Sequence, residues 1–147
     1  MKNLVKTFAI AGLLFASSFT AFAIDKDKDK LNSAVVENVI DAYINTSVKG
    51  DVEHLDNLLG KDFTLKYNTE YNQAPLSRTN YIKQIKSQKG FTFNCDSDYQ
   101  IVEKAGKYSL AKVTLNFSNF IRVDYLTMVQ DSEGWKITEV NSVFEEK

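Results

Sequence analysis

The sequence has few of the residues that cross-link a chain or hold a metal. Among 147 residues there are one cysteine, one proline, one tryptophan and one histidine. Cys95 cannot form a disulfide within the chain, and it sits among Phe91, Phe93 and Tyr99, where a thiol usually packs as a small apolar group. Since His54 is the only histidine, we expect no metal site of ordinary ligand spacing and no cofactor.

The chain also lacks an excess of basic charge. It has 18 Lys and Arg residues against 19 Asp and Glu residues, which gives a formal net charge of −1. Because a nucleic-acid-binding domain needs a basic face, we expect no nucleic-acid partner. Asp25, Asp27 and Asp29 alternate as in a calcium-binding loop, but the glycine and the distal glutamate of such a loop are missing.

No apolar run is long enough to cross a membrane. The longest run, residues 8–22, has 15 residues, whereas a spanning helix needs about 20. Two lysines precede it, and it ends on the small-x-small pattern of residues 21–23. A positive start, a short apolar centre and a small-residue end are the parts of a secretory signal. We therefore expect residues 1–23 to be a cleaved signal peptide and the protein to be exported, periplasmic or secreted, without stable membrane insertion.

The remaining chain is expected to form one domain, residues 32–147, after a charged tether at residues 24–31. Three helices are predicted in its first half from apolar residues at helical spacing and from capping residues. The first carries apolar residues from Val35 to Val48 and ends at Gly50. The second starts at Asp51 and ends at Gly60, and the third starts at Ser77 and ends at Gly90.

Alternation of apolar and polar residues predicts strands in the rest of the domain. The face of residues 121–130 that carries Tyr125 and Thr127 is predicted to point inward, together with Tyr67 of an earlier strand. Helices packed against an antiparallel sheet define an α+β fold, here a cone of three N-terminal helices on a strongly curved antiparallel sheet. The predicted strands are residues 63–67, 91–104, 107–120, 121–130 and 135–144.

Five short stretches carry a resemblance to a known family: Tyr43-Ile44, Gly50-Asp51-Val52, Leu58-Leu59, Asp124-Tyr125-Leu126-Thr127 and Gly134-Trp135-Lys136-Ile137. They resemble the nuclear-transport-factor-2-like superfamily, which includes SnoaL-like cyclases, ketosteroid isomerases and bacterial domains known as putative lumazine-binding. The resemblance covers residues 33–144 and implies a cone-shaped pocket and, commonly, a homodimer packed through the open face of the sheet. The last two of the stretches that carry it are most similar to the lumazine-binding group.

The inward faces suggest an apolar pocket with a few hydroxyl groups, which is the usual composition of a small-molecule site. The alternative is ordinary core packing. Trp135 either closes the wide end of the core or forms a stacking wall for a planar ligand. The expected partner is a small hydrophobic or planar molecule. The candidate lining residues are Tyr43, Phe63, Leu65, Tyr67, Val113, Phe117, Tyr125, Thr127 and Trp135.

The resemblance does not extend to a full set of catalytic groups. Ketosteroid isomerases of this superfamily use a tyrosine, a carboxylate base and a protonated aspartic acid; here these positions fall on Tyr43, Tyr67 and near Thr127. Because two of the three are replaced, we expect a non-catalytic binding module and name no catalytic residue. One alternative is an isomerase, cyclase or dehydratase using Tyr43 with Asp41 or Asp124, although both acids are predicted to face the surface. Another is a dimeric interaction domain with a filled cavity.

Overall fold

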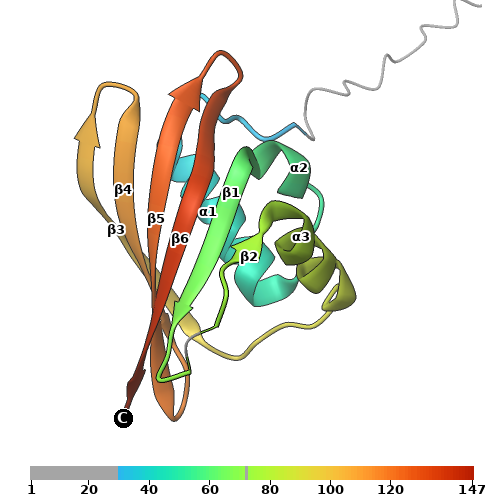
Figure 1. Cartoon of the computed structure of the whole chain (residues 1–147), viewed down its shortest axis with the longest axis vertical. Helices are drawn as coiled ribbons and strands as arrows, with labels where there is room; N and C mark the ends of the chain where they lie inside the picture. Colours follow the sequence, from blue (N-terminus) through green and yellow to red (C-terminus); the bar gives the residue numbers. More distant parts are fainter. Residues whose placement is uncertain (1–29, 72) are drawn as a thin grey trace, which may run out of the picture.

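Within residues 30–71 and 73–147, which the computed structural model describes, six strands form one curved sheet and helices lie beside it (Figure 1). The proposed signal peptide and all but two residues of the proposed tether lie outside the described residues. In chain order the elements are α1 (Val36–Lys49), α2 (Leu55–Leu58), β1 (Leu59–Asn68), β2 (Leu76–Ser77), α3 (Arg78–Ser87), β3 (Asp96–Ala105), β4 (Tyr108–Asn116), β5 (Phe120–Asp131) and β6 (Gly134–Glu146).

The sheet has the strand order β2-β1-β6-β5-β4-β3. Its four C-terminal strands are consecutive antiparallel neighbours, but β1 pairs with β6 in parallel. The α+β class is therefore confirmed, and the prediction of a wholly antiparallel sheet is wrong at this one pair. Alternation of apolar and polar side chains predicts that a segment is a strand and which residues share a face. It does not predict whether a strand pairs in parallel or antiparallel with another that is far away in the sequence.

The prediction of three N-terminal helices is not confirmed as made. α1 and α3 lie within the predicted ranges, and α3 follows β1 as expected, but α2 is a single turn of four residues. Asp51, the predicted cap of the second helix, accepts a hydrogen bond on Oδ1 from the backbone N–H of Glu53, at 3.0 Å. This local bond satisfies the backbone in a turn instead of a helix. Gly60, the predicted end of that helix, lies in β1.

The ends of α1 and α3 are fixed against each other at Gly50. This residue has φ +62° and ends α1 in the left-handed conformation that favours glycine. A Cβ atom here would lie 2.7 Å from the carbonyl oxygen of Gln88, just beyond α3. At the other end of α3, Ser77 caps the helix by accepting from the Asn80 N–H at 3.4 Å. The close approach at Gly50 brings Ser47, in the last turn of α1, beside α3.

The apolar core fills the part of the cone nearest the β5–β6 turn. Leu65, Val140, Leu126 and Ala111 are neighbours across four adjacent strands and are all fully buried. Val36, Val39, Ile40 and Tyr43 of α1 belong to the same cluster. The interior of this part of the cone is packed with side chains.

The predicted orientation of β5 is wrong. Tyr125 is 37% exposed, whereas Asp124, Leu126 and Met128 are fully buried. The inner face of β5 is thus the one that carries Arg122 and Asp124, which alternation alone assigns to solvent. Charged side chains can take an inner position here because they pair with each other, and a paired charge is much cheaper to bury than an isolated one.

Candidate functional site

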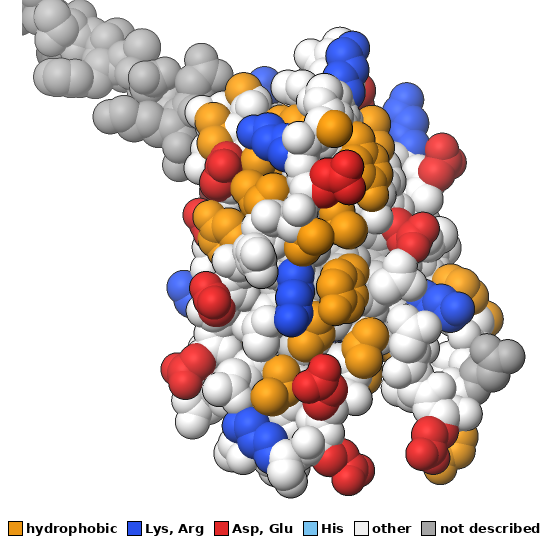
Figure 2. Space-filling view, turned by 90° about the vertical axis from the view of Figure 1, so that its left-hand side faces the viewer, with side chains coloured by type: hydrophobic (Ala, Val, Ile, Leu, Met, Phe, Trp, Pro, Cys, Tyr) orange, Lys and Arg blue, Asp and Glu red, His pale blue; other side chains and the backbone are white. Residues whose placement is uncertain are grey.

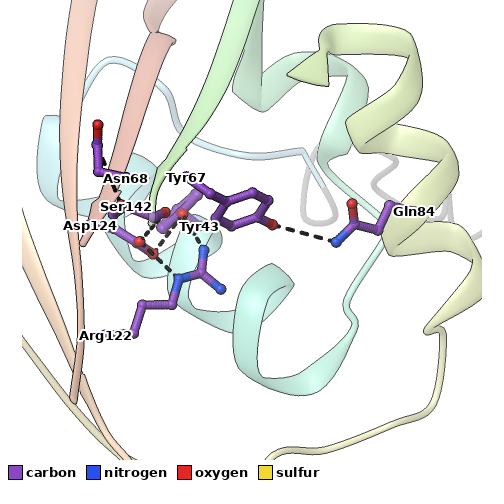
Figure 3. Close-up of polar contacts among 7 residues, drawn as sticks. All are labelled: Tyr43, Tyr67, Asn68, Gln84, Arg122, Asp124 and Ser142. Atoms are coloured by element: carbon purple, nitrogen blue, oxygen red, sulfur yellow. Dashed lines mark hydrogen bonds and ion pairs between the residues drawn. The ribbon is translucent and has the colours of Figure 1, made fainter. Parts of the chain in front are cut away.

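A polar cluster of four side chains joins α1, β5 and β6 (Figure 3). Asp124 and Ser142 face each other across β5 and β6, and the Ser142 hydroxyl donates to Asp124 Oδ1 at 2.5 Å. The hydroxyl of Tyr43, from α1, donates to Asp124 Oδ2 at 2.8 Å. Arg122 lies two residues along β5 on the same face; its Nε donates to Asp124 Oδ1 at 2.8 Å, and its Nη2 donates to the Tyr43 hydroxyl at 3.4 Å.

The electrostatics of this cluster hold the guanidinium of Arg122 in its charged form. Burial lowers the pKa of Arg122, but the neighbouring Tyr43 and Asp124 outweigh burial, and the net pKa is above the ordinary value. Burial, with the Asp124 charge beside it, raises the pKa of Tyr43 well above its usual range, so its hydroxyl keeps the proton that it donates. Asp124 is fully buried and accepts three hydrogen bonds, while the Arg122 side chain is 17% exposed.

The exposed part of Arg122 faces two adjacent hollows, which we call together the Arg122 cavity. The larger has a volume of about 300 Å³ and the smaller, between α1, α3 and β1, about 80 Å³. Ser47, Phe93 and Arg122 line both. The larger hollow is also lined by Phe117, Phe120 and Phe144, and the smaller by Tyr67, Tyr81, Gln84, Ile85 and Gln88.

Aromatic rings form the walls of the larger hollow. Phe117 and Phe120 stack with their ring centroids 4.4 Å apart, and Phe93 meets Phe117 edge-on at 6.3 Å. Phe144 lies 6.1 Å from both Phe120 and Tyr67. Phe93 and Phe144 are 42% and 41% exposed. Grouped aromatic rings that are left open to solvent around a hollow are typical of a binding surface.

The smaller hollow contains polar groups whose hydrogen-bonding capacity is not used. Within the described part of the chain, the buried Ser47 Oγ and Tyr81 hydroxyl have no hydrogen-bond partner. Burial raises the pKa of Tyr81 to about 12, and the Ser47 hydroxyl, which is close by but does not meet hydrogen-bond geometry, opposes the shift. Gln84 Nε2 donates to the Tyr67 hydroxyl at 3.5 Å across the hollow (Figure 3). Buried polar groups without partners are uncommon and call for an explanation.

The structure separates the predicted lining residues into three groups. Tyr67 and Phe117 line the Arg122 cavity, and Tyr43 lies behind its guanidinium. Tyr125 and Thr127, predicted to point inward, lie on the other face of β5, where Tyr125 is exposed and Thr127 half-buried. Four residues belong to the packed core and do not line this cavity: Phe63, Leu65, Val113 and Trp135.

Sequence reasoning missed the residues that dominate the cavity. Arg122 and Asp124 are two positions apart on one strand and therefore share a face, a pairing of opposite charges that could have signalled a buried ion pair. Phe120 and Phe144 are brought together by the antiparallel pairing of β5 and β6, since Phe144 is the direct neighbour of Arg122. Ser47 gave no signal, because a serine near the end of a helix is usually solvated.

Two further features bear on the kind of site. The described residues contain no group of three or more His, Cys, Asp or Glu side chains placed to hold a metal ion. None of the helices in the described ranges is long and apolar enough to cross a membrane.

A curved sheet around α1, with a cavity at the open end, defines a cone-shaped α+β domain. The family described as "Putative lumazine-binding" matches residues 32–145, and the chain belongs to this family. No curated protein matches the chain.

Solved structures give the same fold. A nuclear-transport-factor-2-like protein from Silicibacter pomeroyi DSS-3 is 16% identical with a TM-score of 0.62, covering 78% of this chain and 94% of that chain. A second such protein, from Methylobacillus flagellatus KT, is 20% identical with a TM-score of 0.58 and covers 80% and 98%. A third, from Cytophaga hutchinsonii ATCC 33406, is 15% identical with a TM-score of 0.58 and covers 74% and 93%. The chain is thus nuclear-transport-factor-2-like in fold.

Proposed function

We propose that the protein is a non-catalytic module that binds a small, partly apolar molecule in the Arg122 cavity. The observation that carries the proposal is the combination of aromatic walls with buried polar groups that have no partner. Small-molecule sites are mostly apolar hollows of about 300–1,000 Å³ with a few orienting polar groups. The larger hollow, about 300 Å³, is at the lower end of this range, so the ligand is small. The description of the family, which refers to lumazine binding, also favours a ligand-binding role.

The chemistry of the cavity supports binding more than catalysis. A general base must reach the proton that it abstracts, but Asp124 is fully buried behind Arg122 and already accepts three hydrogen bonds. Asp41, the other acid considered from the sequence, is exposed on α1. No Asp, Glu or His occurs among the residues that line the two hollows within the described chain. A ligand there would be held without a carboxylate or imidazole to act on it.

Binding can be tested with the uncharged fluorescent probe N-phenyl-1-naphthylamine. We expect a saturable rise in fluorescence with wild-type protein and a loss of this rise in Phe144→Ser, which removes a wall of the cavity. Tyr125→Ser is the matched control, because Tyr125 is nearly as exposed as Phe144 and lies on the adjacent strand, facing the other way. The proposal is wrong if the probe gives no saturable signal, or if both variants lose it equally.

We also propose that the outer face of the sheet forms a homodimer. Tyr108 and Val129 are direct neighbours across β4 and β5, and Tyr125 lies on the same face; all three are exposed. Figure 2 shows the side of the molecule on which β3 and β4 lie, where hydrophobic side chains gather in a broken band among charged ones. Burying such a band is favourable. Sedimentation should give twice the monomer mass for wild type and the monomer mass for Tyr125→Lys; a monomeric wild type would contradict this proposal.

Export is the third element of the proposal, and the signal-like composition of residues 1–23 motivates it. Mass spectrometry of the protein recovered from a bacterial host should give an N-terminus at residue 24 in the periplasm or medium. An uncleaved chain retained in the cytoplasm would contradict export.

A further inference from the structure

The residues that line the Arg122 cavity carry a single formal charge, and it is positive. Besides the aromatic and aliphatic side chains, they contribute only neutral hydroxyl and amide groups and the guanidinium of Arg122. Asp124, which balances this charge, lies behind the guanidinium and does not line either hollow. A ligand in the cavity therefore meets the positive partner of the ion pair first.

Arg122 is held in a way that leaves donors free on the cavity side. A guanidinium has five N–H groups. Within the described part of the chain, Nε is used by Asp124 and one N–H of Nη2 by Tyr43. No hydrogen bond from Nη1 is found within the described residues, and Figure 3 shows this nitrogen turned away from Asp124. The Nη1 end of the guanidinium can therefore still present a two-pronged edge of N–H donors, which matches the two oxygens of a carboxylate.

The hydroxyls of Ser47 and Tyr81, which lack partners within the described residues, line the smaller hollow together with Arg122. Ser47 and Tyr81 are at least nine-tenths buried, and each can donate one hydrogen bond. A buried donor without an acceptor destabilises the protein, and a carboxylate has about four acceptor positions for such donors. The two hydroxyls thus need a hydrogen-bond acceptor, and the guanidinium beside them favours an acceptor with negative charge.

We propose that the ligand of the Arg122 cavity is an organic monocarboxylate with a flat or otherwise apolar body, an inference that rests on the binding function proposed above. Arg122 pairs with the carboxylate, and Tyr81 and Ser47 donate to it. The apolar body lies between Phe117, Phe120 and Phe144. Asp124 acts as a positioning residue, since its bond to Nε fixes the orientation of the guanidinium.

The direct test compares naphthalene-2-carboxylate with naphthalene-2-carboxamide, which has nearly the same shape and no charge, by calorimetric titration at neutral pH. We expect the carboxylate to bind at least about tenfold more tightly, because charge-assisted bidentate bonds are roughly twice as strong as neutral ones. In Tyr81→Phe the carboxylate should lose affinity several-fold while the amide loses less. Tyr108→Phe, a tyrosine on the outer face of the sheet, should change neither affinity.

Removing the charge of Arg122 needs a variant that does not leave Asp124 unpaired. The double variant Arg122→Met/Asp124→Asn removes both charges, and we expect it to abolish the preference for the carboxylate while N-phenyl-1-naphthylamine still binds. The inference of a carboxylate ligand is wrong if wild-type protein binds naphthalene-2-carboxylate and naphthalene-2-carboxamide equally. It is also wrong if N-phenyl-1-naphthylamine binds and naphthalene-2-carboxylate does not. In both cases the proposed binding function stands. If no probe binds to wild-type protein, the binding function and the inference fail together.

Discussion

Two buried tyrosines give a comparison that separates a structural hydroxyl from a hydroxyl kept for a ligand. Tyr43 donates to the buried Asp124 carboxylate at 2.8 Å, while the Tyr81 hydroxyl has no partner within the described residues. Both side chains are almost fully buried. Replacing each tyrosine by phenylalanine removes one oxygen atom and keeps the ring, including the packing of Tyr81 on Phe63 at 5.1 Å. The two substitutions therefore differ in the hydrogen bond alone.

The expected changes in the free energy of unfolding have opposite signs. Tyr43→Phe loses a hydrogen bond to a charged group, which is worth about 1.5–3 kcal/mol. Tyr81→Phe removes a buried hydroxyl that pays desolvation without a bond, and we expect a gain in stability of about 1 kcal/mol. The two variants should thus differ by about 3 kcal/mol at equal ring packing.

Urea unfolding of ligand-free protein measures this difference directly. Trp135, the single tryptophan, is buried in the core and reports unfolding by its fluorescence. The dependence of the free energy on urea should be the same in both variants, because the surface exposed on unfolding is nearly unchanged. If Tyr81→Phe is destabilised as strongly as Tyr43→Phe, the Tyr81 hydroxyl has a partner in the ligand-free protein, and its assignment to a ligand is wrong.

Three further predictions concern the same elements. The pKa of Tyr81 is about 12 in the folded protein and about 10 when unfolded. Between these two pH values the unfolded chain loses this proton more readily, so the free energy of unfolding falls as pH rises from about 10 to about 12. This fall should be shallower in Tyr81→Phe. Asp124→Asn leaves the buried Arg122 unpaired and should cost about 3–5 kcal/mol in urea unfolding, whereas a cost below about 1 kcal/mol would show that the pair is solvated. Gly50→Ala introduces a side chain at a left-handed residue and a clash with the backbone, so it should lower the thermal midpoint of unfolding. Gly90→Ala should lower it less, because φ is also positive there but a Cβ meets nothing within 4 Å. Equal effects would mean that the clash at Gly50 is relieved.

The sequence was sufficient to predict those helix ends that depend on residues close by in the chain. The apolar spacing of α1 and the left-handed Gly50 at its end were predicted correctly, as was the cap of α3 at Ser77. In each case the bond or backbone conformation that ends the element involves residues close in the sequence. The single turn of α2 departed from the prediction because Asp51 used its carboxylate in a turn, which competes with helix formation.

The orientation of β5 could not be predicted from alternation, because both of its faces carry apolar residues. What decides the orientation is non-local: Tyr43 of α1 and Ser142 of β6 supply the bonds that make Asp124 acceptable inside. For the same reason, the aromatic walls of the cavity were only partly predicted. Phe117 was expected at the site, while Phe120 and Phe144 depend on how the ends of β5 and β6 meet.

Chemical-shift mapping locates a bound ligand and can show whether it lies at the open end of the cone beside Arg122. Naphthalene-2-carboxylate would be titrated into ¹⁵N-labelled protein, with the Nε–H of Arg122 and the backbone amides followed together. We expect saturable shifts that are largest at Arg122, Ser47 and Phe93. Shifts concentrated instead on Tyr125 and Val129, on the outer face of the sheet, would contradict this expectation.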